Sequence, residues 1–231
     1  YAYDIVSGDT IKNTVTDARG NVSETVFDLA GRKTADRAGV SGAGAAMTTS
    51  YQYNANNQVT LVTRNDGSKE KVTYDSVGQT TRIDYYAAGA DTSAASGYYL
   101  TYVYDAGGNV TRETVTKDGA TEITAYAYDA LNRVSQQTQG AEAVGALPID
   151  YAYNAAGQLS GVSYPRENSQ TGVAATGTGK QTLSFSYDSY GRQSEVKLNG
   201  QLVESYSYTA GGDLMATQVY GKFDTGNTAD Y

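Results

Sequence analysis

A five-residue pattern recurs through this chain of 231 residues, and it constrains the fold more than any other feature. Its first residue is usually Tyr, its second is Asp or Asn in all copies but one, and its fifth is Gly or Asn. Nine copies begin at residues 16, 27, 53, 74, 104, 128, 153, 187 and 208. Because Gly and Asn most readily accept a left-handed backbone, position five is predicted to have a positive φ angle.

Each copy of the motif is predicted to be a hairpin turn: a type I turn closed by a left-handed residue. The side chain at position two can bond backbone amides two residues on, which favours the same turn. The residue after the turn, position six, is polar in every copy, and Val or Leu often follows it as a second strand begins. The expected turn residues are Asp17, Gly20, Asp28, Gly31, Asn54, Asn57, Asp75, Gly78, Asp105, Gly108, Asp129, Asn132, Asn154, Gly157, Asp188, Gly191 and Gly212.

Aromatic residues two positions apart precede many of these turns. Side chains at this spacing lie on one face of a strand, and aromatic residues on adjacent strands stabilise each other by roughly 0.2–1 kcal/mol per pair. We interpret them as a structural ladder; a platform on which sugar rings stack is the alternative. The ladder residues are Tyr51, Tyr53, Tyr102, Tyr104, Tyr126, Tyr128, Tyr151, Tyr153, Phe185, Tyr187, Tyr206 and Tyr208.

The spacing between motifs indicates a second turn in each repeat. Short gaps contain Asp66-Gly67, Asp118-Gly119 or Asn199-Gly200, and the last of these is typical of a tight type I′ turn. Longer gaps carry stretches rich in Ala, Gly, Ser and Thr, which we interpret as surface loops, at residues 39–46, 87–97, 140–147 and 168–179. Helical periodicity is absent, so the predicted fold is all-β: tandem antiparallel hairpins in a single array over residues 1–231.

Composition excludes several kinds of site. The chain has no His and no Cys, which removes Ser-His-Asp and Cys-His nucleophiles and zinc sites built on these residues. Its 17 basic and 25 acidic residues give a net charge of −8, which disfavours a nucleic-acid partner. No apolar stretch is long enough to span a membrane. The motif aspartates are interpreted as turn residues, so no catalytic, cofactor-binding or metal-binding residue is predicted.

The motif resembles the YD repeat of the Rhs family, whose close relations are the C components of insecticidal Tc toxins and the animal teneurins. Nine matches between residues 16 and 214 carry the resemblance. It implies a strip of β-hairpins coiled into a hollow β-shell, which in bacterial members encloses a C-terminal toxin. With this number of repeats, the resemblance implies that the chain forms a curved sheet, an arc of such a shell, and is a fragment of a longer protein.

The resemblance implies a structural, non-enzymatic role in enclosing a toxin polypeptide, with no cofactor. The implied partners are the remainder of the shell, the enclosed toxin, and secretion or toxin-complex subunits. The implied location is secreted, or delivered by a bacterial export system. The family's aspartates implicated in self-cleavage have no match here. The alternative function is an extracellular adhesion or carbohydrate-binding module that uses exposed tyrosines.

Overall fold

The computed structural model describes residues 2–6, 10–39, 47–140, 147–165, 180–212 and 214–219. These residues form eighteen β-strands and no helix, which confirms the predicted all-β class. The chain divides into two compact units, Tyr1–Glu122 and Ile123–Tyr231, with the boundary inside β11 (Ala120–Tyr128). Alternation of apolar or aromatic side chains with small polar ones explains the strands, because it gives each strand two unlike faces.

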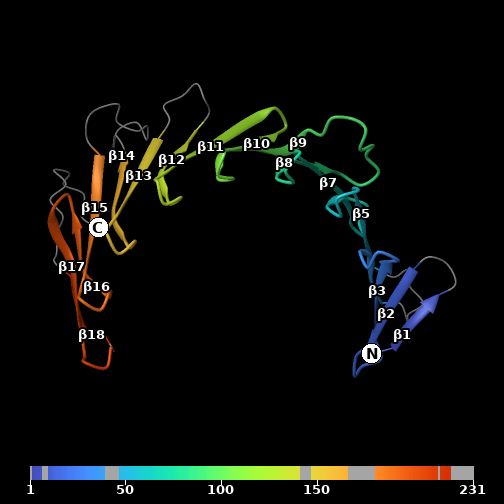
Figure 1. The fold of residues 1–231 in the computed structure, drawn as a ribbon, viewed down its shortest axis with the longest axis horizontal. Helices are drawn as coiled ribbons and strands as arrows, with labels where there is room; N and C mark the ends of the chain where they lie inside the picture. Colours follow the sequence, from blue (N-terminus) through green and yellow to red (C-terminus); the bar gives the residue numbers. More distant parts are fainter. Residues whose placement is uncertain are drawn as a thin grey trace. The chain divides into compact units, whose positions relative to one another are not determined.

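The first unit is an antiparallel meander in which each strand pairs with the next strand along the chain (Figure 1). It contains β1 (Ala2–Val6), β2 (Thr10–Thr16), β3 (Val22–Asp28), β4 (Lys33–Ala38), β5 (Met47–Tyr53), β6 (Val59–Thr63), β7 (Lys69–Tyr74), β8 (Thr80–Tyr86), β9 (Tyr98–Tyr104) and β10 (Val110–Lys117).

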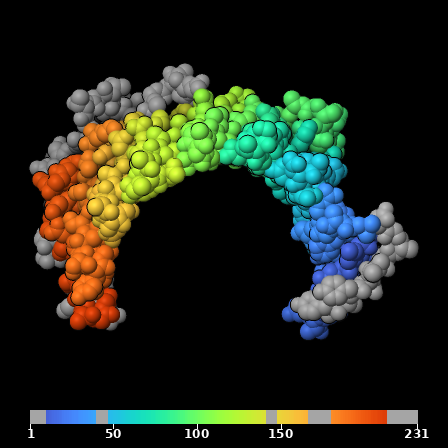
Figure 2. Space-filling model, viewed as in Figure 1, coloured from blue at the N-terminus to red at the C-terminus, as the bar shows by residue number. Residues whose placement is uncertain are grey.

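The second unit repeats this arrangement with the later strands. In the space-filling view the colour grades steadily along each unit, so segments distant in sequence do not interleave (Figure 2). The strands are β12 (Val134–Gln139), β13 (Leu147–Tyr153), β14 (Leu159–Pro165), β15 (Lys180–Tyr187), β16 (Gln193–Leu198), β17 (Gln201–Tyr208) and β18 (Leu214–Val219).

Motif turns follow the odd-numbered strands from β3 onward, so within each unit they share one edge of the sheet, which we call the motif edge. The first copy, Thr16–Gly20, is the exception because it joins β2 to β3 and therefore lies on the opposite edge. This explains its spacing of eleven residues from the second copy, which is the length of one strand and one turn.

A β-bulge adjoins most motif turns. In the β5–β6 pair, Gln52 lies opposite Leu61 whereas Tyr53 lies opposite Val59, so the first strand has one residue fewer than the second. Equivalent shifts occur just before Phe27, Tyr74, Tyr104, Tyr128, Tyr153, Tyr187 and Tyr208. The Thr16 copy pairs regularly, without a bulge. Bulges increase the local twist of a strand pair.

The sheets have little enclosed core. Among the described residues only Val26, Ala35, Tyr86 and Val196 are buried apolar side chains, and no side chain is fully buried. The ladder aromatics are half-buried, while the residue between the two members of a pair is exposed in five of the six pairs, as at Gln52 and Val103. Lateral contacts between neighbouring strands therefore carry most of the stabilisation.

The segment 87–97, between β8 and β9, folds back over the sheet. Lys69 and Lys71 donate to the Ala90 and Thr92 carbonyls at 3.0 and 3.1 Å. The Tyr86 hydroxyl donates to the Ala94 carbonyl at 3.1 Å. The loop thus covers β7 and β8, which explains why Tyr86 is buried. The other expected long loops, 39–46, 140–147 and 168–179, lie wholly or mostly outside the described residues.

Candidate functional site

Position five of the motif adopts the left-handed backbone in all nine copies. The φ angles lie between 59° and 96° at Gly20, Gly31, Asn57, Gly78, Gly108, Asn132, Gly157, Gly191 and Gly212. In each of these turns the amide at position five donates to the carbonyl at position two, as Gly191 does to Asp188 at 3.0 Å. Elsewhere, Asn199 and Gly200 have φ angles of 50° and 82°, as a type I′ turn requires.

The side chain at position two holds the turn from inside. In the motif copy that begins at Tyr187, Asp188 Oδ1 accepts hydrogen bonds from the amides of Tyr190 and Arg192 at 2.9 and 3.0 Å. The same pair of bonds, to positions four and six, is made by Asp17, Asp28, Asn54, Asp75, Asp105, Asp129 and Asn154. A side-chain oxygen that accepts hydrogen bonds from two amides of the same motif stabilises the turn locally.

Ionised aspartates suit this role. The Arg133 guanidinium, together with the amides of Arg133 and Leu131, lowers the pKa of Asp129 from its ordinary value of 3.8. The side chain and amide of Asn109 lower the pKa of Asp105 in the same way. These carboxylates are therefore charged at neutral pH and act as acceptors, which does not suit them to donate a proton as a general acid.

In six copies of the motif, the tyrosine at position one ties its hairpin to the preceding one. Its hydroxyl donates to the backbone carbonyl of position seven in the preceding motif. The bonds measure 2.6–2.9 Å and run from Tyr53 to Lys33, Tyr74 to Val59, Tyr104 to Thr80, Tyr153 to Val134, Tyr187 to Leu159, and Tyr208 to Gln193. The hydroxyl groups of these six tyrosines are thus occupied by the protein itself.

Position six makes contacts that the sequence reasoning missed. Arg192 Nε donates to Asp188 Oδ2 in its own turn at 2.7 Å, while its Nη1 donates to the Thr209 carbonyl in the next turn at 3.3 Å. Its guanidinium also lies 4.4 Å from the centre of the Tyr208 ring. The signal in the sequence was that position six is polar in every copy of the motif. The sequence could not give the distance from this residue to the next hairpin.

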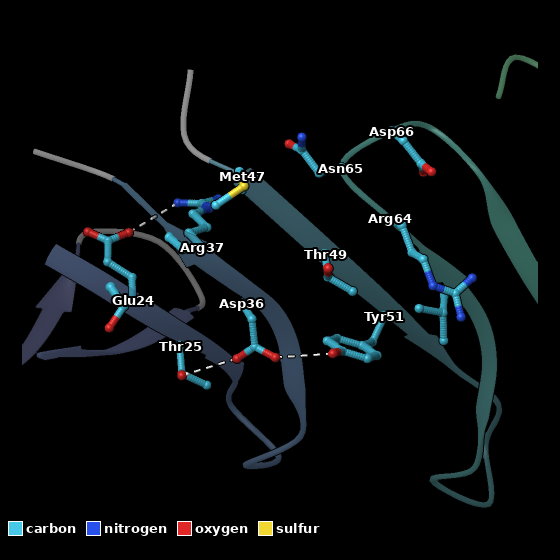
Figure 3. A pocket seen from close by; sticks show the side chains of 13 residues that line it. Glu24, Thr25, Asp36, Arg37, Met47, Thr49, Tyr51, Arg64, Asn65 and Asp66 are labelled. Carbon is cyan, nitrogen blue, oxygen red and sulfur yellow. Dashed lines mark hydrogen bonds and ion pairs between the residues drawn. The ribbon is translucent and has the colours of Figure 1, made fainter. Parts of the chain in front are cut away.

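A groove in the first unit is lined mostly by polar side chains (Figure 3). Asp36 lies at its centre and accepts from Thr25, Lys33 and Tyr51 at 3.2, 2.7 and 3.1 Å. Partial burial opposes ionisation of Asp36, but the Lys33 ammonium and the Tyr51 hydroxyl outweigh it and lower its pKa. On the groove wall, Arg37 lies 3.5 Å from Glu24.

Glu24 and Asp36 of this groove are thus paired with Arg37 and Lys33, and the Arg64 side chain in its wall donates to Glu70 at 2.6 Å. Across the residues that the structure describes, no group of three or more acidic side chains is arranged to hold a metal ion. In the same residues there is no helix of the length and apolarity needed to cross a membrane.

Comparison with known proteins places the fold. No family model and no curated protein sequence matches the chain. Among solved structures, the crystal structure of TcdB2-TccC3-Cdc42 aligns with 90% of this chain at 14% identity and a TM-score of 0.54. The chain shares its fold with part of that assembly. The crystal structure of TcdB2-TccC3-TEV also aligns with 90% of the chain, at 14% identity and a TM-score of 0.50.

The TcdB2-TccC3 similarity confirms the fold of tandem antiparallel hairpins that the repeated motif predicted. The chain spans only 13% of the matched TcdB2-TccC3 chain in each structure. The similarity therefore concerns a hairpin array within a much longer polypeptide.

Proposed function

We propose that this chain is a structural segment of an Rhs-type β-shell whose work is to enclose a toxin polypeptide rather than to catalyse a reaction. The main observation behind this proposal is the structural similarity to part of TcdB2-TccC3, which aligns with 90% of this chain. The motif contacts support it, because position two holds its own turn and positions one and six reach the neighbouring hairpin.

Residues 1–231 act in this proposal as one continuous array that forms an arc of the shell. Its partners are the rest of the shell, the enclosed polypeptide and secretion or toxin-complex subunits, and it is secreted or delivered by a bacterial export system. The catalytic alternative has little support from the side chains, since the motif aspartates are committed to backbone amides.

Limited proteolysis of the full-length protein that carries this segment tests the proposal. We expect a C-terminal polypeptide to resist protease in the native protein and to become sensitive once the array is unfolded. Equal sensitivity in both states, with the array still folded by circular dichroism in the native sample, would contradict enclosure.

The carbohydrate-binding alternative requires tyrosine faces free to stack on sugars. Several ladder rings are instead covered by cations, with Arg133 4.3 Å from the Tyr153 ring centre and Lys33 4.6 Å from that of Tyr51. A glycan array probed with the 231-residue chain separates the two functions, since the shell proposal expects no specific binding.

A further inference from the structure

Two kinds of motif turn differ in the hydrogen bond that joins the side chains at positions two and six. In the first kind, Asn154 Nδ2 donates to Gln158 Oε1 at 2.9 Å. With its oxygen engaged, Gln158 has only Nε2 left, and this atom donates to the Gly191 carbonyl in the next motif turn at 2.8 Å. The pair Asn54 and Gln58 repeats this arrangement, and Gln58 Nε2 donates to the Gly78 carbonyl at 2.9 Å.

In the second kind, Asp at position two pairs with Arg at position six. Asp28 Oδ2 accepts Arg32 Nε at 2.7 Å, and Arg32 Nη1 donates to Asn57 Oδ1 in the next motif turn at 3.1 Å. Asp188 and Arg192 behave alike, with Nη1 directed to the Thr209 carbonyl. In these four turns, the bond inside one turn orients the donor that reaches the following turn; Asp129 and Arg133 form the same internal bond, at 2.7 Å.

Asp75 and Gln79 break this correspondence. A carboxylate has no hydrogen to donate to an amide oxygen, so Asp75 cannot hold Gln79 as Asn154 holds Gln158. Among the described residues, the Gln79 side chain forms no hydrogen bond, although its Nε2 lies beside Gly108 in the next motif turn. If the amide turned its Nε2 toward Asp75, its oxygen would face the next turn and the contact there would be lost.

We infer that positions two and six form a recognition pair, Asn with Gln or Asp with Arg, that determines how each hairpin docks on the next motif turn. The partner is a left-handed turn that offers an oxygen acceptor, and the matched pair supplies the donor in the required direction. The proposal concerns packing between repeats and is independent of whether the array encloses a toxin.

Asp75→Asn tests the pair by creating the missing match. The new amide is expected to orient Gln79 toward the turn at 105–108, and to slow hydrogen exchange of the Asp105 and Gly108 amides by about fivefold, the effect of roughly one net hydrogen bond. Ser76→Ala, in the same turn but outside the pair, is the matched control and should leave these amides unchanged. Unchanged or faster exchange in Asp75→Asn overturns the inference.

Asn154→Asp tests the inference by breaking a native pair, and a second substitution then replaces it with the other native pair, Asp with Arg. The single variant should speed exchange of the Asp188 and Gly191 amides by about fivefold. The double variant Asn154→Asp with Gln158→Arg, which restores a native combination, should return it close to the original rate. Ala155→Ser is the control at the turn tip. If the double variant exchanges as fast as the single one, or faster, the pair carries no recognition and the inference fails.

Discussion

The guanidinium of Arg192 lies 4.4 Å from the centre of the Tyr208 ring, while its Nε donates to Asp188 in its own turn. One side chain therefore joins two consecutive hairpins. The Tyr208 hydroxyl closes the same junction from the other side, because it donates to the Gln193 carbonyl at 2.7 Å. In a sheet with so little enclosed core, such lateral contacts replace the packing that a second layer would provide.

Removal of one tyrosine hydroxyl should measure this junction. Tyr208→Phe keeps the ring and loses the bond to the Gln193 carbonyl, so we expect the free energy of unfolding to fall by about 0.5–1.5 kcal/mol. Urea unfolding followed by circular dichroism measures the change. Tyr190→Phe is the control, because Tyr190 is 82% exposed at a turn tip. This variant should have the same free energy of unfolding as the unmodified chain. Equal losses in the two variants would contradict the role given to the Tyr208 hydroxyl.

Position five should tolerate Asn and reject a β-branched residue. Gly108 has a φ angle of 85°, where valine is strained by about 1–3 kcal/mol, whereas the chain itself places Asn57 at 62°. We expect Gly108→Val to lower the unfolding midpoint clearly and Gly108→Asn to lower it less. The added Cβ would meet only the flexible end of Gln79, so backbone strain is the main effect.

Gly97→Ala provides the control for this pair of substitutions, since Gly97 has an ordinary φ angle and open space around it. It should leave the midpoint nearly unchanged. Similar losses from Val and Asn at position 108 would show that the turn does not depend on a left-handed residue.

Acid should weaken the array through its turn carboxylates. Hydrogen bonds lower the folded-state pKa of Asp105 and Asp129 below 3.8, so the unfolded chain binds more protons in this range. The stability that they contribute is complete above about pH 5 and is lost as pH falls below 3.8 toward the folded-state values. Urea midpoints measured between about pH 6 and about pH 2.5 should therefore fall with acid, and the fall should be smaller in Asp129→Asn. An identical acid dependence in this variant would show that Asp129 makes no such contribution.

The isolated chain should associate with itself. The described pairings give the terminal strands β1 and β18 one neighbour each, β2 and β17, and strand edges of this kind pair readily with other chains. We expect oligomers or aggregates on size-exclusion chromatography with light scattering, increasing with protein concentration. A stable monomer at high concentration would contradict this expectation.

The fold was predictable from sequence because each hairpin is specified locally. The requirement for a positive φ angle at position five and an acceptor at position two is contained within five residues, and the Asn199-Gly200 turn is specified by two. Strand direction then follows from the turn, and the two-residue spacing of aromatics sets the face on which they lie. No long-range information was needed to obtain an antiparallel meander.

The contacts between hairpins were not predictable in the same way. Gln158 and Gly191 are 33 residues apart, and their bond depends on strand spacing and on the orientation of an amide that Asn154 holds. The Thr16 copy shows the same limit, because its five residues have the motif pattern while the strand count places it on the opposite edge. Five residues specify a turn, whereas its place in the sheet depends on what precedes it.

The strictly sequential pairing of strands has a consequence for biogenesis. Each strand finds its partner immediately before or after itself in the chain, so a polypeptide emerging end first from a ribosome or an export channel need not wait for a distant segment. Such a chain can be threaded through a narrow passage as an extended strand and regain order progressively on the far side, one hairpin at a time.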